Sequence, residues 1–179
     1  MKKEIIISGF GGQGGLAIGK NLAEAGMAEG LNVTWAPSYG PEMRGGTANC
    51  SVVLSDRQIG SPVFACPSDL IALNEPSLAK FEAGVQPGGG VFVNCDVVTD
   101  KVSRTDLKAY YIACNRIAEE LGNPKVSNMV MLGAYVAQTK ILKPETIESM
   151  IQHMFTGAKA KLVPLNIEAF HRGMACVSG

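Results

Sequence analysis

The sequence predicts an α/β fold: a Rossmann-like domain with a mostly parallel sheet and a helical C-terminal third. Three observations lead to this prediction. Up to residue 121, short apolar runs alternate with segments of helical periodicity, the pattern of buried strands joined by crossover helices. The first of these runs leads directly into a glycine-rich turn, as in βαβ units. From residue 127 onward only helical patterns remain.

The N-terminal two thirds supply the strands. Residues 4–8 form a short apolar run bounded by Gly9, which predicts a first strand buried on both faces. Apolar residues at 18, 22 and 25 recur at helical spacing, which predicts a helix that ends near Gly30. The same reasoning predicts strands at 32–37, 48–54, 69–74, 90–94 and 110–113, and helices at 75–84 and 115–121.

The C-terminal third is predicted to be entirely helical. Residues 129–137 are apolar on every face, which predicts a helix buried all round. Pro144 begins another helix with one apolar stripe, and a last helix carries Val163, Ile167 and Phe170. The chain has 179 residues and neither an internal repeat nor a linker, so we expect a single domain over residues 1–179.

The composition excludes several classes of function. The 16 basic residues are balanced by 16 acidic ones, so there is no electrostatic footprint for nucleic acid or anionic lipid. No apolar run is long enough to span a membrane, and the apolar run at 5–7 is too short for a secretion signal. Only 18% of the residues are charged, against a typical ~25%, which favours a subunit over a free monomer.

The five cysteines predict no metal centre in this chain. They are widely spaced and form no Cys-x-x-Cys pair, whereas zinc sites and ferredoxin-type clusters need close pairs of thiolates. An odd number of cysteines without a secretory signal indicates reduced thiols and a cytoplasmic protein.

The glycine-rich turn supplies the first candidate ligand residues: Gly11, Gly12, Gln13 and Gly14. With Gly9 it matches G-x-G-x-x-G between a strand and a helix, where backbone N–H groups can approach an anion. A dinucleotide site also needs an acidic residue ~20 positions later, but residues 34–38 contain none, which disfavours NAD. A bound phosphate group and a turn built only for tight packing both remain open.

The segment from Tyr39 to Gly46 supplies the other candidates: Tyr39, Glu42 and Arg44. Gly and Pro bracket the charged pair, and ordering such a loop costs conformational entropy, so we expect it to face a ligand or partner. The alternative is an exposed ion pair of little consequence. No residue type or spacing supports a catalytic set around His153 or His171, so we assign no catalytic residues.

Taken together, these motifs resemble the gamma subunit of the 2-oxoacid:ferredoxin (or other acceptor) oxidoreductases, which oxidatively decarboxylate 2-oxoacids to acyl-CoA. The resemblance runs end to end and rests on residues 9–14, 37–50, 59–62 and 128–133. Tyr-Gly-Pro-Glu-Met-Arg-Gly-Gly is most similar to the 2-oxoglutarate branch. The branched-chain 2-oxoacid and pyruvate enzymes are the alternatives.

The resemblance implies an accessory subunit of a larger complex, with no cofactor or metal of its own. Thiamine diphosphate, magnesium and an iron–sulfur cluster are expected in partner subunits: alpha, beta, and a delta or ferredoxin-like subunit. Coenzyme A is a candidate ligand at the loop that carries Arg44. A rival interpretation is a free-standing enzyme that binds flavin or NADP at the glycine turn, and a third is a scaffold domain without a ligand.

Overall fold

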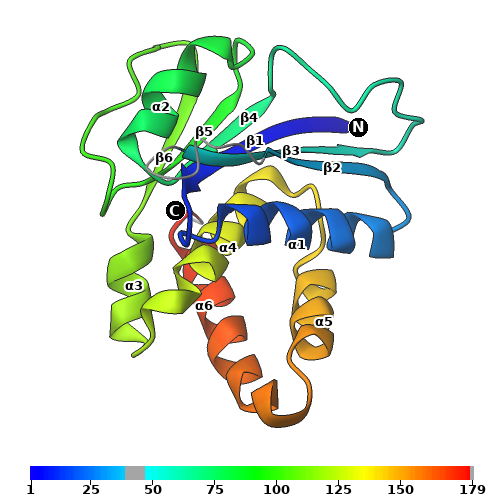
Figure 1. Cartoon of the computed structure of the whole chain (residues 1–179), viewed down its shortest axis with the longest axis vertical. Helices are drawn as coiled ribbons and strands as arrows, with labels where there is room; N and C mark the ends of the chain where they lie inside the picture. Colours follow the sequence, from blue (N-terminus) through cyan, green and yellow to red (C-terminus); the bar gives the residue numbers. More distant parts are fainter. Residues whose placement is uncertain (39–46, 178–179) are drawn as a thin grey trace.

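The computed structural model describes residues 1–38 and 47–177, which form a six-stranded sheet with helices on both faces (Figure 1). The strands are β1 (Lys2–Phe10), β2 (Asn32–Ser38), β3 (Thr47–Ser55), β4 (Asp69–Ala72), β5 (Gly90–Asn94) and β6 (Lys108–Ile112). The α-helices are α1 (Gly15–Ala28), α2 (Glu75–Phe81), α3 (Cys114–Glu120), α4 (Ser127–Thr139), α5 (Pro144–Met154) and α6 (Val163–Ala175). Short 3₁₀ turns are η2 (Glu82–Gly84), η3 (Pro124–Val126) and η4 (Gly157–Leu162).

The sheet is mostly parallel, as predicted, but its strand order differs from a simple βαβ arrangement. The order is β2-β3-β1-β4-β5-β6. Strands β1, β4, β5 and β6 pair in parallel, whereas β3 runs antiparallel to both β1 and β2. The predicted unit of first strand, helix and second strand exists. Its two strands are nevertheless not neighbours, because β3 lies between them.

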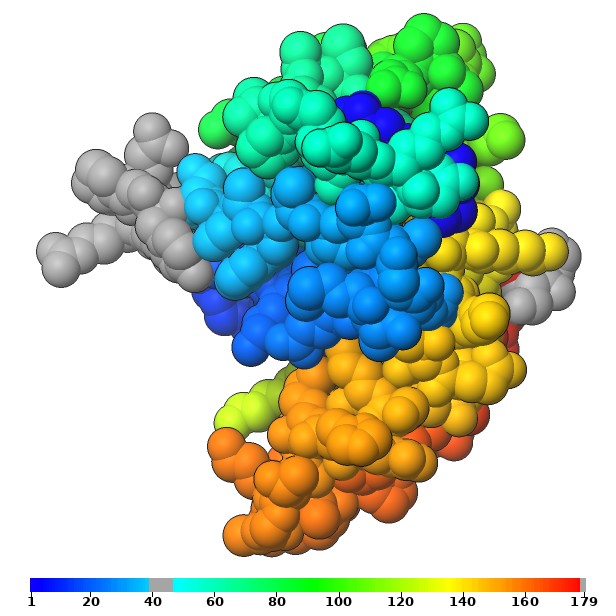
Figure 2. Space-filling model, turned by 90° about the vertical axis from the view of Figure 1, so that its right-hand side faces the viewer, coloured from blue at the N-terminus to red at the C-terminus, as the bar shows by residue number. Residues whose placement is uncertain are grey.

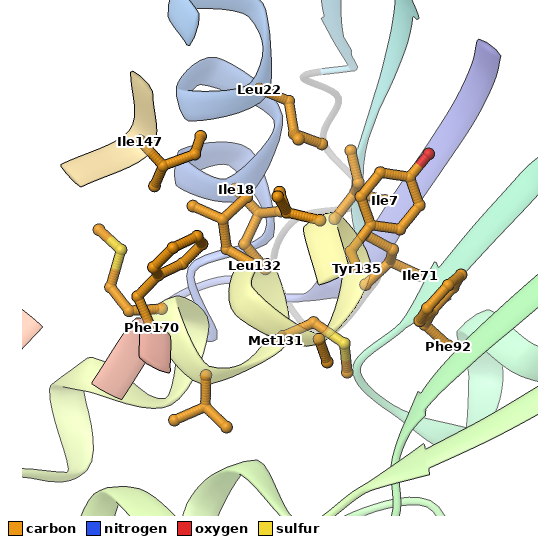
Figure 3. Close-up of a cluster of buried hydrophobic side chains, with 14 of the residues drawn as sticks. Ile7, Ile18, Leu22, Ile71, Phe92, Met131, Leu132, Tyr135, Ile147 and Phe170 are labelled. Carbon is orange, nitrogen blue, oxygen red and sulfur yellow. The ribbon is translucent and has the colours of Figure 1, made fainter. Parts of the chain in front are cut away.

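Two hydrophobic clusters cover the two faces of the sheet. The larger one joins the sheet to α1, α3, α4, α5 and α6, with Ile7, Ile18, Leu132, Ile147 and Phe170 among its fully buried members (Figure 3). The smaller one lies under α2, on the opposite face of β4 and β5. Figure 2 shows α1 (blue) lying above α5 (orange), two helices that contact each other. The helices described here include none long and apolar enough to cross a membrane.

Helix α4 is buried on all sides, as its sequence predicts. Eight consecutive residues from Met129 to Val136 are buried. The helix packs against α6 so closely that glycine is required on both sides. A Cβ on Gly133 would lie 2.0 Å from the carbonyl oxygen of Phe170, and one on Gly173 would lie 1.9 Å from that of Val130. The two backbones therefore touch, which no other residue type permits at these positions.

Candidate functional site

The candidate site lies where β1 and β4 end side by side. The chain leaves β1 toward α1 on one face of the sheet and leaves β4 toward α2 on the other face. This divergence makes a topological switch point, the place where ligands bind in open α/β sheets. The glycine turn follows β1 directly, so the fold brings the predicted turn to this position.

The turn has the backbone geometry that its glycines allow. Gly12 has φ 88° and Gly14 has φ 81°, both in the left-handed region that favours glycine. A Cβ on Gly14 would also lie 2.7 Å from the Cβ of Asn128 at the start of α4. By contrast, a Cβ on Gly11 would meet none of the described residues within 4 Å, so these residues leave space open above Gly11.

A cavity of ≈ 330 Å³ opens beside the turn and the first turn of α1. Among the described residues, no side chain caps α1, and the first backbone bond of the helix runs from Ile18 N to Gly14 O at 2.9 Å. The preceding N–H groups of the helix are therefore available, and the positive end of its dipole favours an anion there. The cavity is lined by Phe10, Gly11, Gly12, Gly14, Gly15, Leu16, Ala17 and Ala48.

Gln13 holds the turn in place and does not face the cavity. Its Oε1 accepts a hydrogen bond from Phe10 N at 2.6 Å, and its Nε2 donates to the carbonyl oxygen of Leu73 at 3.0 Å. The side chain thus ties the end of β1 to the residue that follows β4. Of the four turn residues predicted from the sequence, Gln13 has a positioning role in this structure, while Gly11, Gly12 and Gly14 line the cavity.

Three polar residues around the switch point escaped the sequence analysis. Asn74 is 1% exposed, and its Oδ1 caps α2 by accepting from Ser77 N at 2.9 Å, whereas its Nδ2 has no acceptor among the described residues. The hydroxyl of Ser77 donates to that of Ser8 on β1 at 2.8 Å. An Asn before Glu-Pro is a helix-start signal that would have predicted the cap. No sequence signal predicts the contact with Ser8.

The thiol below the start of α1 is not an activated nucleophile. Cys50 is buried, and its Sγ donates to the carbonyl oxygen of Gly15 at 3.8 Å. Burial raises the pKa of this thiol to about 11, since a thiolate would be poorly solvated there. Cys50 therefore stays protonated near neutral pH, as expected for an apolar residue in a strand. Cys95 directly follows β5 and is half-buried.

Tyr39, Glu42 and Arg44 lie outside the described residues. The residues that border this segment are both at the switch-point edge of the sheet. Thr47 pairs with Phe10, directly before the glycine turn, and Ser38 at the end of β2 pairs with Asn49. The two motifs singled out from the sequence thus leave the sheet from the same edge.

The strand order disfavours a dinucleotide site. In a dinucleotide-binding βαβ unit, the second strand lies beside the first and carries the acidic residue that binds the ribose. Here β3 separates β2 from β1, and β2 ends at Ser38 without an acidic residue. The strand order is thus a second reason against a dinucleotide site, in addition to the lack of an acidic residue at 34–38.

The two histidines lie on helices away from the switch point. His171 on α6 contacts Glu148 through Nε2 at 2.6 Å, and His153 on α5 contacts the carbonyl oxygen of Ser149 through Nδ1 at 2.6 Å. Both contacts are exposed. The first joins α6 to α5, and the second joins successive turns of α5, within the helical third of the chain (Figure 1). Neither ring adjoins the glycine turn.

The chain matches a known family over nearly all of its length. Residues 4–176 match the family described as pyruvate ferredoxin/flavodoxin oxidoreductase. The chain is 38% identical to the ketoisovalerate oxidoreductase subunit VorA of Methanothermobacter marburgensis, over 93% of this chain and 35% of VorA. It is also 38% identical to the 2-oxoglutarate synthase subunit KorC of Methanocaldococcus jannaschii, over 97% of this chain and 92% of KorC.

A solved structure agrees with these relatives. The gamma subunit of a keto/oxoacid ferredoxin oxidoreductase from Geobacter sulfurreducens superposes with a TM-score of 0.84 at 32% identity, covering 98% of each chain. The match confirms the predicted fold class. The chain spans about a third of the VorA relative and nearly the whole of KorC. It belongs to the pyruvate ferredoxin/flavodoxin oxidoreductase family, which confirms the resemblance to its gamma subunits that was recognised from the sequence.

Proposed function

We propose that this chain, as a single domain, is the accessory gamma subunit of a thiamine diphosphate-dependent 2-oxoacid:ferredoxin oxidoreductase in the cytoplasm. The observation that carries the proposal is the match over 98% of each chain to a solved structure that is itself named as the gamma subunit of a keto/oxoacid ferredoxin oxidoreductase. Alpha and beta subunits, with a delta or ferredoxin-like subunit, hold thiamine diphosphate, magnesium and the iron–sulfur cluster. This chain contributes no catalytic residue.

The functional part of the subunit is the switch-point edge, which is the end of the sheet where β1 and β4 finish side by side. The cavity beside Gly11 and Gly12 has free backbone donors at the start of α1, and the segment with Tyr39, Glu42 and Arg44 leaves the sheet at the same edge. Together they suit contact with a partner subunit or with an anionic group such as those of coenzyme A.

The favoured substrate is 2-oxoglutarate. The KorC relative is matched over 92% of its own length, whereas the VorA relative of equal identity is matched over 35%. The branched-chain and pyruvate enzymes remain the alternatives. The test is to co-express the chain with the subunits encoded beside it and to measure coenzyme A-dependent dye reduction with 2-oxoglutarate, ketoisovalerate and pyruvate. We expect the highest kcat/KM with 2-oxoglutarate, and a preference for either other acid contradicts the assignment.

The isolated chain distinguishes this proposal from the flavin or NADP enzyme. An accessory subunit is expected to purify colourless, without iron, thiamine diphosphate, flavin or nicotinamide. Iron analysis and an absorption spectrum make the measurement. A stoichiometric flavin or cluster retained by the chain alone contradicts the accessory role.

Arg44 tests the contribution of the second motif. We expect Arg44→Ala to leave the domain folded but to lower the activity of the assembled complex, because an unpaired carboxylate or phosphate partner typically costs ~2–5 kcal/mol. Arg44→Lys is expected to rescue poorly, since an ammonium lacks the planar fork. Dye reduction measures turnover, and a pull-down with the other subunits measures assembly. Normal assembly and wild-type turnover in the alanine variant show that the loop is merely solvated.

A further inference from the structure

A second cavity lies at the opposite edge of the sheet, where β4, β5 and β6 begin. Its volume is ≈ 290 Å³, and its lining includes Lys3, Asp69, Lys108, Tyr110 and Gln138. Asp69 and Lys108 are the first residues of β4 and β6. Nothing in the proposed function uses this edge.

A buried carboxylate forms one wall of this cavity and is contacted by four donors. The side chain of Asp69 is 3% exposed and accepts from Lys3 Nζ at 2.8 Å and from the Tyr135 hydroxyl at 3.0 Å. It also accepts from Ser68 Oγ and from Gly90 N, each at 3.2 Å. Three of these contacts fall on Oδ2 and only that from Gly90 N falls on Oδ1, so the carboxylate is held mainly through Oδ2.

The buried network fixes Lys3 at the cavity wall. Tyr135 lies in the core beside Ile7, Ile71 and Phe92, with its hydroxyl at the edge of the cluster (Figure 3). Burial, and then the charge of Asp69, hold the pKa of Tyr135 well above its usual range, so the phenol stays protonated and donates. Burying a charged group is costly unless it is paired, and here the pair holds one ammonium group in a defined position.

The remaining groups at the cavity are mainly donors. Lys3 has three N–H donors and uses one on Asp69. The hydroxyl of Tyr110 accepts from Gln138 Nε2 at 2.9 Å, which leaves its own hydrogen free to donate. Lys108 is exposed and has no acidic partner among the described residues. The ring of Tyr110 stacks on Phe92 at 4.7 Å between centroids, so its hydroxyl is held rigidly.

We propose that this cavity binds a small oxyanion, a phosphate or carboxylate group, through Lys3, Lys108 and Tyr110. Two ammonium groups face one carboxylate, which leaves a net positive charge for the ligand. A cavity of ≈ 290 Å³ holds the volume of about ten water molecules, which suits a small metabolite and not a dinucleotide. Because the site lies at the amino ends of the strands, it is separate from the switch point.

The test measures binding to the purified full chain at low ionic strength. Orthophosphate and succinate are the probes, titrated by calorimetry or by changes in amide NMR shifts. We expect saturable binding of at least one probe by the wild type. Lys108→Gln and Tyr110→Phe should each weaken it, the former by about tenfold or more, because each removes one charge-assisted hydrogen bond. Both substitutions leave the buried Asp69–Lys3 pair intact.

Lys159→Gln in η4 is the matched control, because it makes the same change in net charge away from the cavity. Tighter binding of orthophosphate identifies a phosphate ligand, and tighter binding of succinate identifies a carboxylate ligand. The proposal is overturned if neither probe saturates up to millimolar concentration. It is equally overturned if Lys108→Gln binds as tightly as Lys159→Gln.

Discussion

Glycine performs opposite tasks at the switch point and at the crossing of α4 with α6. At the crossing, an added Cβ would lie 1.9–2.0 Å from a backbone carbonyl oxygen, so Gly133 and Gly173 allow the two helices to approach closely. At the turn after β1, an added Cβ on Gly11 or Gly12 would meet nothing within 4 Å among residues 1–38 and 47–177. One pair closes the core, and the other leaves a surface open.

The comparison shows that a glycine-rich motif has no single meaning. In the turn, the fold itself demands glycine at positions 12 and 14, which have positive φ, and a Cβ on Gly14 would also lie 2.7 Å from the Cβ of Asn128. Gly11 has no positive φ, and a Cβ on it would have no close neighbour in the part of the chain that the structure describes, so this part of the fold does not explain it. A residue that folding does not require is the better candidate for contact with something outside the chain.

The largest effect is expected at the helix crossing. Gly173→Ala places a methyl group against the carbonyl of Val130, and backbone atoms cannot rotate away as a side chain does. The helices must separate, which we expect to destabilise the domain by about 3 kcal/mol or more. Urea unfolding followed by circular dichroism gives the free energy of unfolding.

Gly60→Ala is the control for this substitution, since its added methyl would have no neighbour within 4 Å and its φ is not in the left-handed region. Equal stability of the two alanine variants would mean that α4 and α6 do not cross as closely as described. The contrast between the crossing and the turn would then disappear.

A smaller effect on stability is expected at the contact between α1 and β3, where Gly19 packs against the side chain of Cys50. Here the variable is pH, because the Cys50 thiol can ionise. A Cβ on Gly19 would lie 2.4 Å from Cys50 Sγ, a thiol whose pKa burial raises from 9.0 to about 11. Because the folded pKa is the higher one, this thiol's contribution to stability is complete below pH 9 and is lost as pH rises toward 11. The loss should reach about 1 kcal/mol at pH 10.

The measurement compares urea unfolding at pH 8 and pH 10 for wild type, Cys50→Ala and Cys66→Ala. Burial also raises the pKa values of Cys114 and Tyr135, so every variant should lose stability in alkali. Cys50→Ala should lose less stability in alkali than the wild type, because it lacks the buried thiol. Cys66→Ala is the control and should lose as much stability as the wild type, since Cys66 is exposed. If the stability of Cys50→Ala depended on pH as that of the wild type does, the Cys50 thiol of the wild type would be in contact with water.

The smallest effect on stability, and the sharpest test of the turn, is Gly11→Ala. We expect unchanged or slightly higher stability, up to about 1 kcal/mol, because alanine reduces the entropy of the unfolded chain at a compatible position. Activity of the assembled complex should nevertheless fall if a ligand or partner approaches the backbone there. Dye reduction by the reconstituted complex decides the point. Wild-type turnover would leave Gly11 without a function in either fold or site.

Local sequence features predicted the individual elements well. The i, i+4, i+7 spacing at Ile18 and Leu22 predicted α1, and Gly30 with φ 78° ends it as expected. The apolar run over α4 predicted a fully buried helix, and Met129 to Val136 are buried. These features depend on neighbours along the chain, and such neighbours are visible in the sequence itself.

The candidate site was predicted only in part, for the same reason. The glycine turn can be predicted from the spacing of its residues, whereas the hydrogen bond from Gln13 to Leu73 joins residues 60 positions apart. The burial of Asn74 was not predicted either, because the sequence indicates its cap to α2 but not that its Nδ2 is buried without an acceptor among the described residues. The segment with Arg44 remains a prediction from the sequence.

By itself, the sequence determined the α/β class, most element positions, the recognition of the family and the two motifs that mark the candidate site. Only the tertiary structure decided that β3 lies between β1 and β2, that Asp69 joins Lys3 and Tyr135, and that Gly133 and Gly173 bring two helices into contact. Periodicity records which face of an element is apolar. It does not record which distant element covers that face, because that choice depends on how all the faces pack together.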